Sequence, residues 1–183
     1  VGGGLLGQLL IQMLSQAGFE VDIFDLNQNL SEISLKNGAN HFLQPTELSG
    51  RHNSYHGAIM TVPQCDTEMW SDLAEALQVN ANIVLVGAAD LNVSRENFYK
   101  KRLNFLTAYS YGAGRGEYGY EVLNLKSRLN ISGLTPIDQL IEQSICLIDR
   151  KIISFGFVDV VDMTTNSEFE ENFIKNGAVA YLF

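Results

Sequence analysis

Residues 1–7 read VGGGLLG, so Gly2, Gly4 and Gly7 stand at the spacing GxGxxG. They open a segment with apolar residues at helical intervals, which ends at Gly18 and leads into a β-type run over 21–25. That run closes on Asp25, an acid 23 positions after Gly2. A glycine turn, a helix, a strand and a terminal acid in this order predict a nucleotide-binding βαβ unit and a Rossmann-type α/β fold.

Each part of this motif has its own predicted task. Gly2 permits the tight turn, Gly4 lets the backbone approach a pyrophosphate, and Gly7 lets the helix and strand pack closely. The amides of Leu5 and Leu6 at the helix start would hold the phosphate charge. The terminal acid would accept hydrogen bonds from the adenosine ribose. The alternative is a tight glycine turn beside a surface aspartate, with no ligand.

The helix after the glycines is expected to bury an apolar stripe, which consists of Leu6, Leu9, Leu10, Met13, Leu14 and Ala17. Only Val1 precedes the turn, whereas the motif needs a buried parallel strand that leads into it. We therefore expect a C-terminal piece of a longer protein, with the first strand missing from a doubly wound parallel sheet.

Strand and helix signals alternate along the following residues, as in a parallel sheet with helices on both faces. Helices are predicted over 30–36, 67–77 and 98–101, and strands over 41–43, 57–62, 83–87 and 103–109. The polar stretch 45–53 reads as a turn, and 112–133 reads as a loop. After Thr135 and Pro136 the pattern predicts a helix to about Asp149, a strand over 155–161, a short helix from 167 to about 177, and a strand over 178–183.

Composition indicates a soluble globular protein of the cytoplasm. Of its residues 46% are hydrophobic and 18% are charged, and the net charge is −9. The basic residues form no patch, which argues against nucleic-acid partners, and no stretch has the length or the basic leader of a membrane span or signal peptide. Cys65 and Cys146 form no disulfide framework, which suits a reducing compartment.

The chain resembles the C-terminal half of the medium-chain, zinc-type alcohol dehydrogenase superfamily. The likeness lies in residues 1–7, 36–40 and 83–87, and in the helix–strand–helix–strand order after Thr135. A finer likeness, in 98–101 and 110–115, is to bi-domain and sugar- or polyol-related members. The resemblance implies a Rossmann domain over 1–133, a return segment of the catalytic domain over 134–183, and NAD as cofactor. Zinc is implied only through the family's N-terminal domain, which is absent here.

The resemblance and the general placement of ligands at the carboxyl ends of parallel strands give the same further candidates for cofactor binding. These are Thr61, Val62, Gly87, Ala88, Ser110 and Tyr111. Ordinary loop packing is an equal alternative for each of them. No catalytic residue is assigned.

Two other patterns are interpreted without a ligand. His52 and His56 stand four residues apart, and His41 and Cys65 could complete a set of metal ligands. No CxxC or HExxH pattern accompanies them, so we interpret the histidines as exposed or strand-edge residues and expect no metal site in this chain. A second GxGxxG, at Gly114, Gly116 and Gly119, opens no apolar-periodic helix and is interpreted as a flexible loop.

These features predict the cofactor-binding portion of an NAD-dependent oxidoreductase, which transfers hydride between the nicotinamide and an alcohol or carbonyl such as a sugar or polyol. The chain alone is expected to be inactive, and the full-length protein to be a homo-oligomer acting on a small molecule. Two alternatives remain open: a non-enzymatic NAD-sensing module and a methyltransferase. An upstream domain with Cys, His and Glu ligands would favour the dehydrogenase over the sensor.

Overall fold

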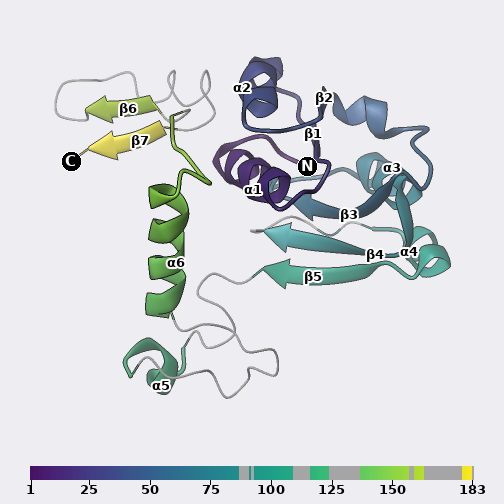
Figure 1. The fold of residues 1–183 in the computed structure, drawn as a ribbon. Coiled ribbons are helices and arrows are strands. Elements are labelled where there is room, and N and C mark those ends of the chain that lie inside the picture. The colour runs from purple at the N-terminus through teal and green to yellow at the C-terminus, as the bar shows by residue number, and fades with distance from the viewer. Residues whose placement is uncertain are drawn as a thin grey trace. The chain divides into compact units, whose positions relative to one another are not determined.

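The computed structural model describes residues 1–86, 91, 93–108, 116–123, 137–156, 159–162 and 179–182. The chain forms two compact units (Figure 1). One unit consists of 1–106 with 154–183, and the other consists of 107–153. The predicted domain division after residue 133 stays a prediction.

Helices and strands alternate along residues 1–108. The elements in this range are α1 (Leu5–Gln16), β1 (Asp22–Phe24), η1 (Gln28–Leu30), α2 (Ser31–Lys36), β2 (His41–Leu43), η2 (Pro45–Leu48), β3 (Tyr55–Met60), α3 (Thr67–Ala76), β4 (Leu77–Val86), α4 (Arg95–Lys101) and β5 (Asn104–Ala108). Later elements are α5 (Tyr118–Glu121), α6 (Ile137–Asp149), β6 (Asp159–Asp162) and β7 (Val179–Leu182).

The strands pair in parallel, as the alternation predicts. β1 pairs with β2, and β3 pairs with β4, which also neighbours β5. Val1 and Gly2 lie between these two sheets and bond to both: the Gly2 N–H donates to the Phe24 carbonyl at 2.9 Å, and the Thr61 N–H donates to the Val1 carbonyl at 2.9 Å. The resulting order is β2, β1, Val1–Gly2, β3, β4, β5, which is the order of a Rossmann sheet.

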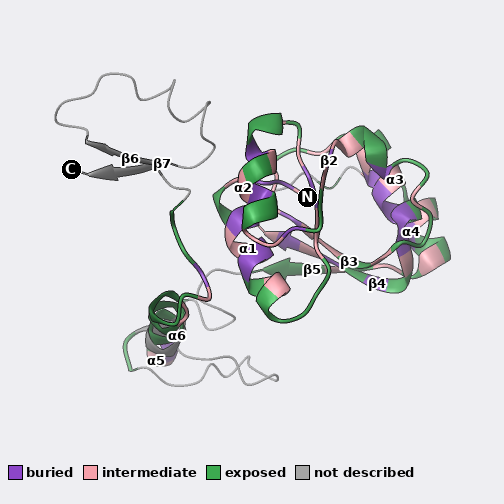
Figure 2. Cartoon of the chain, turned by 45° about the horizontal axis from the view of Figure 1, so that its top comes forward, coloured by how far each residue is buried: buried purple, intermediate pink, exposed green. Residues whose placement is uncertain are grey.

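The strands separate two layers of helices (Figure 2). On one side α1 and α2 cover a small core of Ile11, Ile23 and Ala39. On the other side α3 and α4 cover a larger core, in which the rings of Trp70, Phe98 and Phe105 pack against one another. Helices on both faces of a parallel sheet confirm the predicted doubly wound α/β class.

Periodicity predicts the α3 face correctly. Trp70, Leu73 and Ala74 on its predicted stripe are fully or almost fully buried. Leu77, predicted as the last residue of the stripe, is also buried but begins β4. The side chain of Asp66 caps this helix by accepting from the Met69 N–H at 2.8 Å.

The predicted α1 face is wrong. Leu6 and Met13 are 48% and 42% exposed, and Ala17 is also exposed. The buried face instead carries Gly7, Gln8, Ile11 and Gln12. The reason is that Gly7 allows a close approach and that the two glutamines form hydrogen bonds inside the protein, so polar residues occupy the inner stripe.

Several boundaries differ from the predictions. The stretch predicted as a turn contains η2, whose Leu48 is buried, and β6 begins at Asp159 rather than at Phe155. Gly119 lies in α5, so part of the second GxGxxG is helical rather than a loop. The helix predicted to end near Asp149 is confirmed as α6. Thr135, Pro136 and the helix predicted near 167–177 lie outside the described residues.

Candidate cofactor site

The glycine turn joins the start of α1 to the middle of the sheet. Gly2 has φ +98°, a conformation that L side chains rarely adopt, and a Cβ there would collide with the Thr61 hydroxyl. A Cβ on Gly7 would collide with the Gly2 carbonyl oxygen. The turn therefore requires glycine at both positions, whether or not a ligand is bound.

The first turn of α1 has free backbone donors. Gly4 is the N-cap and offers no side chain to cap the helix. Among the described residues, the N–H groups of Leu5, Leu6 and Gly7 have no hydrogen-bond partner, and the first intrahelical bond runs from the Gln8 N–H to the Gly4 carbonyl. The side chains of Leu5 and Leu6 are exposed. This end of the helix can therefore donate to an anion.

Asp25 follows the last residue of β1 and faces the glycine turn. Its Oδ2 accepts from the Gly3 N–H at 2.6 Å, and its Oδ1 accepts from the Asn27 N–H at 2.7 Å. An ionised carboxylate can accept about four hydrogen bonds. The Asp25 carboxylate is thus fixed in place by two backbone amides and still has acceptor capacity for a ligand.

Thr61 and Val62 follow β3 on the other side of the turn. The Thr61 hydroxyl donates toward the carbonyl oxygens of Val1 and Gly2, at 2.8 and 2.9 Å. Val62 is half-buried and packs against the larger core. The structure therefore places Thr61 and Val62 beside the glycine turn, where both residues support the backbone. Contact with a cofactor stays a prediction for both.

The other four predicted candidates, Gly87, Ala88, Ser110 and Tyr111, lie outside the described residues.

Sequence reasoning missed the polar residues behind the glycine turn. Gln8 is 1% exposed, and its Nε2 donates to the Gly3 carbonyl and to Ser34 Oγ, both at 2.8 Å. Its Oε1 accepts from Asn37 Nδ2 at 2.9 Å. The available signal was a pair of glutamines, Gln8 and Gln12, four residues apart in an otherwise apolar helix.

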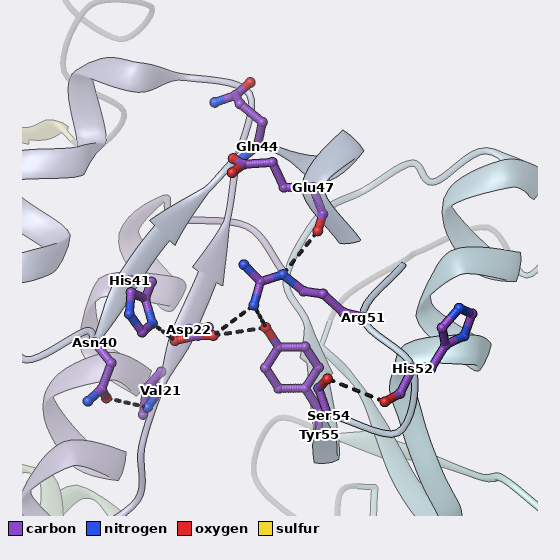
Figure 3. A network of polar contacts seen from close by, with 10 residues as sticks. All are labelled: Val21, Asp22, Asn40, His41, Gln44, Glu47, Arg51, His52, Ser54 and Tyr55. Atoms are coloured by element: carbon purple, nitrogen blue, oxygen red, sulfur yellow. Dashed lines mark hydrogen bonds and ion pairs between the residues drawn. The ribbon is translucent and has the colours of Figure 1, made fainter. Parts of the chain in front are cut away.

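A second polar network lies at the amino ends of the strands, opposite the glycine turn (Figure 3). Asp22 accepts from the Tyr55 hydroxyl at 2.8 Å and pairs with His41 at 2.8 Å, while Arg51 Nη1 lies 3.3 Å from the Tyr55 hydroxyl. Burial, together with the Asp22 carboxylate, raises the pKa of Tyr55 to about 12. Tyr55 therefore stays protonated and ties β3 to β1 as a structural donor.

The histidines do not gather around a metal site. His41 pairs with Asp22, and His52 lies 3.5 Å from Glu75. Within the described ranges, no group of three or more His, Cys, Asp or Glu side chains could hold a metal ion. No helix in the described part of the chain has the length and apolar character needed to cross a membrane.

Solved structures share this fold at low sequence identity, and alcohol dehydrogenases recur among them. Acetophenone reductase from Geotrichum candidum, in complex with NAD, is 13% identical with a TM-score of 0.68, and the match covers 98% of this chain and 46% of that one. L-idonate 5-dehydrogenase from Escherichia coli is 12% identical with a TM-score of 0.69, covering 100% and 48%.

The mycobacterial protein Rv1454c, complexed with NADPH, is 14% identical with a TM-score of 0.72, covering 98% of this chain and 54% of that one. No family model and no curated protein matches the sequence. The chain therefore has the Rossmann-type fold found in alcohol dehydrogenase structures, and it spans about half of their length.

Proposed function

We propose that this chain is the cofactor-binding portion of an NAD-dependent oxidoreductase. The observation that carries the proposal is the position of the Asp25 carboxylate, bonded to the Gly3 N–H beside the uncapped start of α1. This pairing offers an acceptor for ribose hydroxyls next to donors for a pyrophosphate, at the carboxyl ends of β1 and β3. Several neighbours in fold support the same class, since they are dehydrogenases or were solved with NAD or NADPH.

The tasks of the chain in this proposal are to bind and to orient. The N–H groups of Leu5, Leu6 and Gly7 would hold the pyrophosphate, and Asp25 would hold the adenosine ribose. When bound, the nicotinamide supplies the hydride chemistry. The residue that moves the substrate proton is not assigned within the described residues. We place it in the wider protein, together with any zinc.

NAD is preferred over NADP in this proposal, although two of the neighbours in fold were solved with NADPH. A 2′-phosphate would bring like charge toward Asp25 and remove a hydroxyl donor. No Arg or Lys occurs over residues 26–35 to receive it, and Asn27 already bonds to the carboxylate. We expect NAD to bind about 10- to 100-fold tighter than NADP. This ratio corresponds to the free energy usually lost when one polar group is repelled or loses its hydrogen-bond partner.

Asp25→Ala is expected to remove most of this preference. Calorimetric titration of both cofactors into the complete protein measures the ratio of dissociation constants. Asp22→Ala is the matched control, because Asp22 lies at the opposite end of the same strand and bonds to Tyr55 instead. Equal or tighter binding of NADP by the parent protein would contradict the assignment, as would a ratio that Asp25→Ala leaves unchanged.

The substrate proposal is an alcohol or carbonyl, with sugars and polyols as the first compounds to test. L-idonate 5-dehydrogenase is one of the neighbours in fold, which supports that order. NADH production by the complete protein over a panel of alcohols and polyols tests it. Tight NAD binding without turnover on any of them would favour the sensing module. Homo-oligomer formation by the full-length protein remains a further proposal.

A further inference from the structure

We propose that Gln8 is a positioning residue for the cofactor, because it fixes the orientation of the peptide between Gly3 and Gly4. This inference rests on the proposed function of the glycine turn. It assigns a role in pyrophosphate binding to a buried side chain that does not itself reach the ligand.

The first step is the geometry of one peptide group. The Gln8 Nε2 donates to the Gly3 carbonyl at 2.8 Å, within the buried interior between α1 and α2. The Gly3–Gly4 peptide is trans, so its N–H points away from its carbonyl. Because the carbonyl is held inward by Gln8, the Gly4 N–H is turned outward, toward the amides that begin α1.

The second step is that the Gly4 N–H is available. Among the described residues it has no hydrogen-bond partner. It therefore adds a donor to those of the first helical turn, which are free as well. A glycine peptide rotates easily, because glycine adopts many backbone conformations. Without a restraint, rotation of this peptide would turn its carbonyl dipole toward a bound anion.

The third step is that Gln8 is itself held rigidly. Its Nε2 also donates to Ser34 Oγ, and its Oε1 accepts from Asn37 Nδ2. Both partners belong to the segment that forms and ends α2, so the side-chain amide cannot turn over without breaking two further bonds. On the other side of the same residue, the Gly3 N–H is fixed by Asp25. Gly3 is thus restrained at both its N–H and its carbonyl.

Gln8→Leu in the complete protein tests this role. The variant has a side chain of similar size, but this side chain is apolar and cannot donate to the Gly3 carbonyl. We expect ADP-ribose and NAD to bind about 10- to 100-fold weaker, because a hydrogen bond between a backbone donor and a phosphate is lost or misaligned. Adenosine, which has no phosphate, should bind as it does to the parent protein. A general loss of stability would weaken the binding of adenosine as well as that of ADP-ribose and NAD.

Gln12→Leu is the matched control. Gln12 is also a buried glutamine of α1, but its side chain exchanges hydrogen bonds with the backbone of Ser154, at 2.7 and 3.2 Å. Its Nε2 also donates to the backbone carbonyl of Gln8 at 3.2 Å, but no hydrogen bond joins its side chain to Gly3. We expect Gln12→Leu to lower the thermal midpoint while leaving the ADP-ribose affinity within about twofold of the parent.

Asn37→Ala provides a second, milder variant in case Gln8→Leu does not fold. It removes one anchor of Gln8 and keeps the bond to Gly3, so a loss of about threefold for ADP-ribose is expected, again without loss for adenosine. Parental ADP-ribose affinity in folded Gln8→Leu would overturn the inference. If only Asn37→Ala folds, parental ADP-ribose affinity in Asn37→Ala would overturn the inference. A parent protein that binds neither NAD nor ADP-ribose would instead overturn the proposed function.

Discussion

Gly4→Val is expected to weaken NAD binding by at least about 100-fold and to leave the fold intact. A branched side chain at this N-cap would occupy the space through which the backbone approaches the pyrophosphate. Gly4 has φ −66° and ψ −164°, which are extended values outside the left-handed region that favours glycine. The loss should therefore fall on the ligand and spare the sheet.

Thermal unfolding with and without NAD measures this effect. A ligand at a hundredfold its dissociation constant stabilises the folded state by about 2.7 kcal/mol, which raises the midpoint of a chain of this size by roughly 5–10 °C. Gly4→Val should lose that rise. Gly156→Val is the control, because a Cβ on Gly156 meets no atom within 4 Å. An unchanged NAD-induced rise in Gly4→Val would mean that the glycines form only a structural turn.

Gly7→Ala is expected to destabilise the protein by about 3 kcal/mol, although alanine is the better helix former. Helix propensity alone would favour alanine by about 1 kcal/mol. The added Cβ, however, would meet the Gly2 carbonyl oxygen, which lies between β1 and β3 and accepts from the Thr61 hydroxyl. Because a backbone atom so fixed cannot move aside cheaply, overpacking outweighs propensity.

Urea unfolding gives the free energy for Gly7→Ala, and the thermal midpoint should fall by roughly 6–12 °C. Gly156→Ala is the control, since a Cβ there meets open space and Gly156 has no positive φ. Its stability should match the parent within about 0.5 kcal/mol. A Gly7→Ala protein as stable as the parent would contradict the close approach of α1 to the glycine turn.

The sequence predicts well those elements in which the hydrophobicity of each side chain matches its burial. The strand over 41–43 is confirmed to the residue as β2, and the apolar stripe of α3 is buried as expected. Both follow from local sequence patterns alone. The structure places Asp25 beside Gly3, as expected for the order of turn, helix and strand in a nucleotide-binding unit. Its contact with a ribose stays a prediction.

The face of α1 could not be predicted in the same way. The hydrophobic pattern predicts that Leu6 and Met13 are buried. The buried stripe instead begins with Gly7, which has no side chain and so adds nothing to a hydrophobic pattern. Gln8 reads as a surface residue until its three hydrogen-bond partners are known. Two of these, Ser34 and Asn37, lie more than 25 residues away along the chain. Hydrogen bonds between residues so far apart in the chain cannot be recognised from the sequence around Gln8.

The junction formed by Val1 and Gly2 also bears on the order in which the chain folds. The Gly2–Phe24 bond closes 22 residues, whereas the Val1–Thr61 bond closes 60, and closure entropy makes the longer loop costlier by about 1 kcal/mol. We expect the α1–β1–β2 half, which contains the Gly2–Phe24 bond, and the β3–α3–β4 half to gain structure first, and the Val1–Thr61 bond between them to form last. Substitutions that weaken the contact of Val1 with Thr61 should then accelerate unfolding and leave the refolding rate almost unchanged.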